Sequence, residues 1–174
     1  SLLPNKFPSL NGDHPRLIIP FFDKENVFFG YQGRAFGKEN PKYITIMLKE
    51  KNKIFGLDRI NSNQHIFVVE GPIDSLFLDN CLAVAGADFK LDMDEKDYTV
   101  IYDNEPRNVE IIKRMEKSIE QNQSIVIWPD NIEEKDINDM ILSGRTSVEI
   151  HRIISKNTFS HLHAKTRLIN WKKI

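Results

Sequence analysis

Acidic side chains recur just after short apolar runs of this sequence, and their chemistry suits metal-assisted reactions. The runs at residues 65–69, 98–102 and 124–128 are followed respectively by Glu70, by Asp103 and Glu105, and by Asp136. Carboxylates brought together repel one another, and a divalent cation relieves that repulsion. Oxygen-only ligands favour Mg²⁺ or Mn²⁺. Two such ions would stabilise the attacking and leaving oxygens of a phosphoryl transfer. Taken singly, each acid would more often be a solvated residue or a helix N-cap, as for Asp74 and Asp136, but three acidic groups after successive strands favour a site.

Buried strands must position these acids. The apolar runs are continuous rather than alternating, and helical patterns separate them, which is typical of a mostly parallel sheet covered on both faces. In such sheets, sites gather beyond the carboxyl ends of the strands. We therefore predict an α/β fold in which these acids converge. The expected strands are His65–Glu70, Ala83–Gly86, Tyr98–Tyr102 and Ser124–Trp128, and the expected helices are Ile73–Asn80, Val109–Gln121, Asp136–Ser143 and Ser147–Lys156.

The first 60 residues have a different pattern, with short apolar runs separated by turns. Leu17–Phe22 and Val27–Tyr31 flank a polar turn and predict a β-hairpin. The β-branched run Tyr43–Ile46 predicts a further strand. We expect a small, curved, largely antiparallel subdomain at 1–60, a domain at 61–145 that holds the acids, and a C-terminal helical segment at 146–174.

Composition narrows the class of protein. The chain has 174 residues and is 40% hydrophobic, which fits one globular domain or two small ones. No apolar stretch is long enough for a transmembrane helix, so we expect no membrane partner. The single cysteine, Cys81, excludes an internal disulfide and any zinc site built on two cysteines of this chain. A cytoplasmic setting is the default expectation.

Charge is segregated along the chain. Residues 1–60 carry 10 basic and 6 acidic side chains, residues 61–140 carry 7 and 18, and residues 141–174 carry 7 and 1. The simplest interpretation is a set of solvated faces. The alternative is a polyanionic partner held on basic surfaces over an acidic centre that needs metal cations.

The acidic motifs resemble a known domain. The stretches "VVEGPID", "IYDNEPRN" and "KDIND" are similar to the motifs of the TOPRIM domain, which DnaG-type primases, topoisomerases and related nucleases share. The family has Asp-x-Asp where this chain has Asp103-x-Glu105. The stretch "RLIIPFFDKENVFFGYQGRAFGKENPKYIT" resembles the basic subdomain that precedes TOPRIM in bacterial primases. The combination "EGPIDSLF", "DNEPR", "KDINDMI" and "KYITI" resembles the catalytic C-terminal part of T-even-type bacteriophage DNA primases.

This resemblance implies a role for each matching residue. It implies metal-binding and catalytic roles for Glu70, Asp103 and Glu105, with Asp136 as a further metal ligand. It implies a secondary acidic site at Asp74, Asp136, Asn138 and Asp139. It implies nucleic-acid or nucleotide contacts at Arg16, Arg34 and Lys42, with Lys53 and Arg107 as weaker candidates.

The function implied is Mg²⁺- or Mn²⁺-dependent synthesis of short RNA primers on single-stranded DNA, from ribonucleoside triphosphates, in the cytoplasm of an infected bacterium. The resemblance also implies a hexameric replicative helicase as partner. Two alternatives are open: a TOPRIM nuclease using the same metals, and a TOPRIM scaffold that binds DNA without catalysis.

Overall fold

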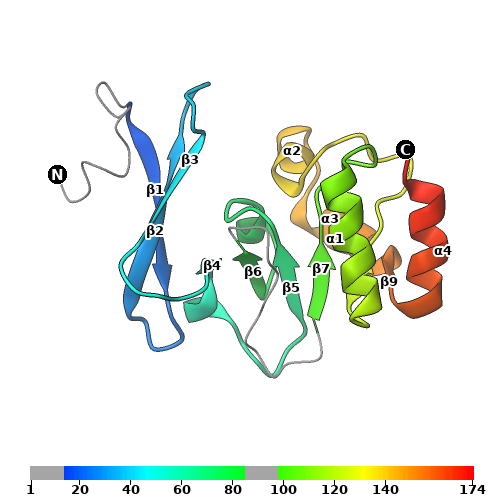
Figure 1. Ribbon diagram of the computed structural model, residues 1–174, viewed down its shortest axis with the longest axis horizontal. Helices are drawn as coiled ribbons and strands as arrows, with labels where there is room; N and C mark the ends of the chain where they lie inside the picture. Colours follow the sequence, from blue (N-terminus) through cyan, green and yellow to red (C-terminus); the bar gives the residue numbers. More distant parts are fainter. Residues whose placement is uncertain (1–13, 85–97) are drawn as a thin grey trace.

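Two β-sheets lie beside each other in the computed structural model, which describes residues 14–84 and 98–174 (Figure 1). The first sheet has the order β1-β2-β3, with strands Arg16–Phe22, Phe28–Ala35 and Tyr43–Met47. All of its pairs are antiparallel. The Asp23 carboxylate closes the β1–β2 turn by accepting hydrogen bonds from the N–H groups of Glu25 and Val27. The predicted hairpin and third strand are both present.

The second sheet has the order β4-β6-β5-β7-β8-β9. Its strands are Ile54–Phe55, Cys81–Val84, Ile66–Val69, Tyr98–Ile101, Ser124–Val126 and Thr158–Phe159. The four central strands are parallel, and the edge strands β4 and β9 are antiparallel. The expected mostly parallel sheet is confirmed. The edge strands have two residues each, too few to produce a periodic pattern. Residues 85 and 86 of the expected strand at 83–86 lie outside the described residues.

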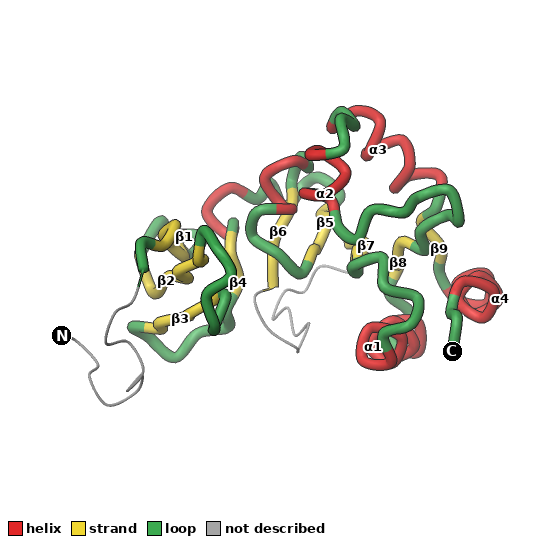
Figure 2. Tube along the Cα trace, turned by 90° about the horizontal axis from the view of Figure 1, so that it is seen from above, coloured by secondary structure: helices red, strands yellow, loops and turns green. Residues whose placement is uncertain are grey.

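Helices cover both faces of this sheet, as Figure 2 shows. Helices α2 and α3 lie on one side of the row of strands, and α1 and α4 lie on the other. The bounds are Val109–Glu120 for α1, Ile137–Leu142 for α2, Ser147–Lys156 for α3 and His161–Trp171 for α4. Among the described residues, no helix combines the length and apolar content that crossing a bilayer requires.

The helix expected at residues 73–80 is reduced to a short 3₁₀ turn, η2, at Asp74–Phe77; another 3₁₀ turn, η1, covers Leu57–Arg59. The Ser75 hydroxyl donates to the carbonyl of Pro72 at 2.7 Å, a local bond that competes with helix extension. Leu78 is extended, and Asn80 has a positive φ of 49°, so the chain turns directly into β6.

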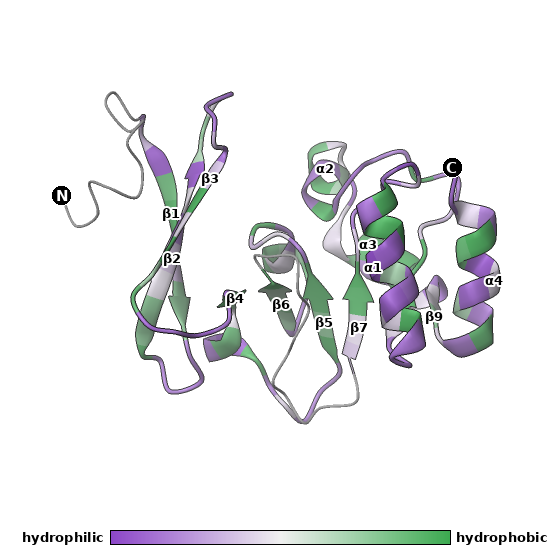
Figure 3. Cartoon of the chain, viewed as in Figure 1, coloured by the Kyte–Doolittle hydropathy of each residue, from purple (hydrophilic) through white to green (hydrophobic). Residues whose placement is uncertain are grey.

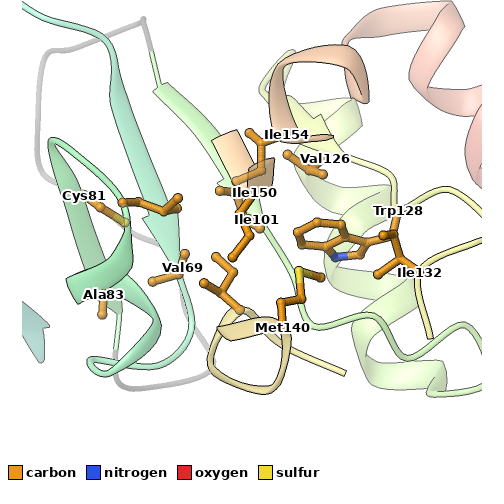
Figure 4. Close-up of a cluster of buried hydrophobic side chains, with 12 residues drawn as sticks. Val69, Cys81, Ala83, Ile101, Val126, Trp128, Ile132, Met140, Ile150 and Ile154 are labelled. Carbon is orange, nitrogen blue, oxygen red and sulfur yellow. The ribbon is translucent and has the colours of Figure 1, made fainter. Parts of the chain in front are cut away.

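Alternate residues of the central strands form two cores. Val69, Ile101 and Val126 pack with α2 and α3 around Trp128 (Figure 4). Val100 and Ile125 pack instead with α1 and α4. Figure 3 shows β5 in hydrophobic colours, whereas α1 and α4 carry both colours, as expected for a strand buried on both faces and for helices with one buried stripe. The C-terminal helices therefore share the core of the parallel sheet.

Candidate active site

The strand order reverses beside β5. The chain runs from β5 to β6 on one side, and then crosses to β7 on the other. Such a switch point leaves a crevice beyond the carboxyl ends of the two strands, where ligands bind in open α/β sheets. Val69 and Ile101 are opposite each other at these ends. Glu70 follows Val69 directly, and Asp103 comes two residues after Ile101.

Four carboxylates meet at this point. Glu70, Asp74, Asp103 and Asp136, hereafter the acidic cluster, line one cavity of about 430 Å³. Gln32 of β2, Tyr43 of β3 and Lys42, which directly precedes β3, line the same cavity, so it lies between the two sheets. The structure thus brings together acids that are up to 66 positions apart in the sequence, from Glu70 to Asp136.

Glu70 is held by an arginine of α1. The Nη1 of Arg114 donates to its Oε2 at 2.9 Å, and about a quarter of each side chain is exposed (22% for Glu70, 24% for Arg114). The other carboxylate oxygen, Oε1, is buried and has no hydrogen-bond partner among the described residues. Glu70 therefore has one oxygen paired with Arg114 and one buried oxygen that no described residue pairs.

Asp103 lies in an electrostatically unfavourable position. Burial, followed by the negative charge of Glu70, raises the pKa of Asp103 to about 7. The ammonium of Lys135 partly offsets this, with its Nζ 3.6 Å from Asp103 Oδ2 and 3.5 Å from Glu105 Oε1. Glu105 also accepts a hydrogen bond from the Asn108 side chain at 3.2 Å. Lys135 thus bridges the two acids of the Asp-x-Glu motif.

The remaining candidates of the secondary acidic site, Asp74, Asp136, Asn138 and Asp139, contribute through different groups. Burial raises the pKa of Asp74 to about 6, although its Oδ1 accepts from the backbone N–H of Asn138 at 2.8 Å. Asp136 caps α2 by accepting from the backbone N–H of Asp139 at 2.7 Å. The Asp139 side chain is exposed. Asn138 and Asp139 therefore contribute backbone N–H groups that orient Asp74 and Asp136.

The basic candidates occupy three places. Arg34 and Lys42 lie over the ring of Tyr43, 6.0 and 5.6 Å from its centroid, and Lys42 lines the cavity. Arg16 donates to the backbone carbonyls of Pro41 and Lys42, which braces the start of β3. Lys53 is exposed before β4 and does not line the cavity. Arg107 lines a second cavity of about 520 Å³ with Glu105 and Lys173.

The cluster has the donor chemistry of a divalent-cation site. It supplies carboxylate oxygens, one of which is buried and unpaired. The pKa of Asp103 is raised first by burial and then by the charge of Glu70, and a bound cation would offset both effects. In the part of the chain that the structure describes, no three His, Cys, Asp or Glu side chains are grouped closely enough to hold one ion. Arg114 and Lys135 neutralise these acids in the present arrangement.

Three residues of the site were missed in the sequence: Gln32, Arg114 and Lys135. Arg114 had a detectable signal, because it lies between Ile111 and Ser118 on the face of α1 that faces the sheet. A charge at such a position indicates a buried partner of opposite sign. Gln32 and Lys135 gave no comparable signal, since their partners belong to other elements.

The comparisons agree with the motifs. No family model matches the chain. It is 39% identical over 166 residues to the DNA primase of Enterobacteria phage T4, an alignment that covers 92% of this chain and 48% of the phage protein. The chain therefore spans about half the length of the curated relative that it matches. This match confirms the resemblance inferred from the motifs.

Solved primase structures share the fold. The Aquifex aeolicus primase (zinc-binding and RNA polymerase domains) matches with a TM-score of 0.61 and 21% identity, over 83% of this chain and 41% of that one. The RNA polymerase domain of Mycobacterium tuberculosis DnaG gives 0.64 and 18%, over 83% and 56%. A DnaG catalytic domain bound to single-stranded DNA gives 0.63 and 17%, over 90% and 55%.

Proposed function

The chain is related in sequence to part of a phage DNA primase and has the fold of DnaG-type primase cores, and from this relationship we propose that it synthesises RNA primers. The single observation that carries the proposal is that the acidic cluster lines a cavity whose other side is lined by Gln32, Lys42 and Tyr43. We propose single-stranded DNA as template and ribonucleoside triphosphates as substrates.

Each part of the site has a role in this reaction. Glu70, Asp103 and Glu105 would hold Mg²⁺ or Mn²⁺, with Asp136 beside them. Their side chains would have to move closer together around the ion, because no three acids of the described residues are grouped closely enough for it in the present arrangement. The metal, when bound, would increase the acidity of the attacking 3′-hydroxyl and neutralise charge on the reacting phosphate. Lys42 would provide positive charge for phosphates across the cavity, and Arg34, which lies over the same Tyr43 ring, would add to it. Arg114 orients Glu70, and the backbone of α2 orients Asp74 and Asp136.

The finer assignments are part of the same proposal. The acid-bearing region at 61–145 would be a TOPRIM domain, with a basic primase-type subdomain at 1–60 and a helical segment at 146–174. The location of the acids at the β5–β7 switch point supports the TOPRIM assignment. Similarity to a phage T4 protein supports action in the infected bacterial cytoplasm, and the motif resemblance supports a helicase partner.

A priming assay on single-stranded DNA tests the proposal directly. The chain is incubated with ribonucleoside triphosphates and Mg²⁺, and the oligoribonucleotides formed are measured. Glu70→Gln and Asp103→Asn are each expected to reduce synthesis at least about 100-fold, because each removes a carboxylate ligand of the proposed metal ion. Glu120→Gln, an exposed carboxylate at the end of α1, is the matched control and should leave synthesis unchanged.

The same assay separates the alternatives. Shortened DNA without oligoribonucleotides would indicate a TOPRIM nuclease. DNA binding without either product, with unchanged binding in Glu70→Gln, would indicate a scaffold. Retained synthesis in either acid variant would refute the assigned roles, provided that circular dichroism shows an unchanged fold.

A further inference from the structure

Two buried side-chain oxygens without a hydrogen-bond partner stand out among the described residues: Oε1 of Glu70 and Oε1 of Gln32. Both side chains line the cavity of the acidic cluster. The Glu70 oxygen has a role in the proposed metal site. Gln32 is only 6% exposed, and its carbonyl oxygen has no role in the metal chemistry described above.

The Gln32 amide is held in place from one side. Gln32 lies in the middle strand of the antiparallel sheet, opposite Ile19 on β1 and Thr45 on β3. Its Nε2 donates to the Thr45 hydroxyl at 3.2 Å. An unpaired buried acceptor lowers the stability of the folded chain, so a glutamine at this position is not explained by folding stability. Because most buried polar groups in folded proteins are paired, an unpaired one calls for a functional role or for a bound group that pairs it.

A carbonyl oxygen only accepts hydrogen bonds, so the ligand group that it binds must be a donor. Phosphate oxygens of a triphosphate are acceptors and do not qualify. Base amino groups are donors, but they differ among the four bases, and an enzyme that copies a template must accept more than one base. A ribose hydroxyl is a donor that every ribonucleotide carries, next to the phosphates that react.

We propose that Gln32 is a specificity-determining residue, whose Oε1 accepts a hydrogen bond from a ribose hydroxyl of the ribonucleoside triphosphate. This inference rests on the proposed function, since it names the group of that substrate that the site recognises. Thr45 is the positioning residue, because its hydroxyl accepts from Nε2 and so fixes the orientation of the Gln32 amide.

Equilibrium binding of ATP, 2′-deoxy-ATP and 3′-deoxy-ATP in the presence of Mg²⁺ tests the inference. The parent chain is expected to bind ATP about tenfold more tightly than one of the two deoxy analogues, the magnitude of one buried hydrogen bond. In Gln32→Met, which keeps the side-chain volume but lacks the acceptor, this preference should disappear. Affinity for the deoxy analogue should stay the same, because that ligand makes no such bond. The exposed Gln64→Met is the matched control and should keep the parental preference.

Folding and function are separated by further measurements. Gln32→Met should fold with a urea midpoint close to that of the parent, because it removes an unpaired buried acceptor and also the Nε2 bond to Thr45, and the two effects oppose each other. If that variant does not fold, Thr45→Val tests the same contact and should reduce the preference at least threefold. A preference that is unchanged in the folded variant, or a parent that binds all three nucleotides equally, overturns the inference while leaving primer synthesis intact. A parent that binds no nucleotide and makes no primer overturns the proposed function as well.

Discussion

Lys135 places its ammonium between the two carboxylates of the Asp-x-Glu motif, 3.6 Å from Asp103 and 3.5 Å from Glu105. A divalent cation bound there would compete with this internal cation. We expect Lys135→Met to bind Mn²⁺ about five- to tenfold more tightly, because a positive charge a few ångströms from the site opposes a second one. Titration followed by electron paramagnetic resonance measures the affinity.

Lys113→Met controls for the loss of one positive charge from the same part of the chain, since Lys113 pairs with the exposed Glu110. Its Mn²⁺ affinity should equal that of the parent. Equal or weaker Mn²⁺ binding in Lys135→Met would show that the ammonium does not compete with the metal.

The raised pKa of Asp103 predicts how stability depends on pH. Its pKa is raised from 3.8 to about 7 in the folded chain, and that of Asp74 from 3.8 to about 6. The folded chain therefore binds these protons more tightly than the unfolded chain. The resulting stabilisation is complete below pH 4 and is lost as the pH rises to about 7.

Without metal, the free energy of unfolding should accordingly fall between pH 4 and pH 7, and Asp103→Asn should flatten this decline. Urea unfolding at fixed pH values measures it. Added Mg²⁺ should stabilise the chain more at pH 8 than at pH 5, because the metal needs the ionised carboxylates. A decline of equal size in Asp103→Asn would assign it to other groups.

Gly71 is required by the position of Asp74. A Cβ added at Gly71 would overlap the Asp74 Oδ2 atom. Gly71→Ala should therefore lower the free energy of unfolding by about 1–3 kcal/mol, or displace the Asp74 carboxylate from the cavity. Urea unfolding and Mn²⁺ titration distinguish these results. In the double variant Gly71→Ala/Asp74→Ala the overlap is removed, so the added methyl group should cost little relative to Asp74→Ala alone.

At the scale of elements, one loop keeps the second half of the site in position. The side-chain amide of Asn104 donates to the carbonyls of Ile132 and Glu134 at 2.9 and 3.1 Å. Its backbone N–H donates to the carbonyl of Lys135 at 2.6 Å. These bonds tie the loop after β7 to the loop before α2, and so keep Asp103 near Asp136.

Asn104→Ala should therefore lower the free energy of unfolding by roughly 1–2 kcal/mol and weaken Mn²⁺ binding. The Trp128 indole, which donates to the carbonyl of Tyr102 at 2.8 Å, is a fluorescent reporter beside this loop. Its emission should change on Mn²⁺ addition in the parent, and change less in Asn104→Ala. If Mn²⁺ changes the Trp128 emission of Asn104→Ala as much as that of the parent, this loop does not determine metal binding.

At the scale of elements, the sequence predicts individual helices and strands but not how they are arranged. Helices α1 and α3 follow from strong periodicity, and the capping box of Thr146 and Glu149 marks where α3 begins. The convergence of Glu70 and Asp103 follows from acids placed after buried strands. Strand order is not a local property, so the switch point between β5 and β7 was not predictable. The roles of Gln32 and Lys135 depend on contacts between elements and were equally hidden.

At the scale of the whole molecule, acidic and basic residues that are far apart in the sequence lie on opposite sides of one cavity. Four acids of residues 61–140 line the cavity at the end of the parallel sheet, Lys42 lines it from the other side, and Arg34 lies beside Lys42 over the ring of Tyr43. Tyr43 lies under both cations and close to the cluster, since the negative charges of Asp74, Asp136 and Asp103 contribute to its raised pKa. An anionic strand could therefore contact the basic sheet while metal ions neutralise the acids.

This arrangement predicts a salt-dependent contact with single-stranded DNA. Each phosphate neutralised by a protein cation releases counterions, so the logarithm of the affinity falls with the logarithm of salt concentration by about 0.7 per contact. The double variant Arg34→Ala/Lys42→Ala should bind DNA more weakly and have a slope shallower by about 1.4, measured by fluorescence anisotropy from 50 to 200 mM salt. Arg152→Ala/Lys156→Ala removes two positive charges from α3, away from the cavity, and should retain the parental slope. If both double variants lose the same slope, DNA responds to net charge alone, and the antiparallel sheet is not the surface that the template follows.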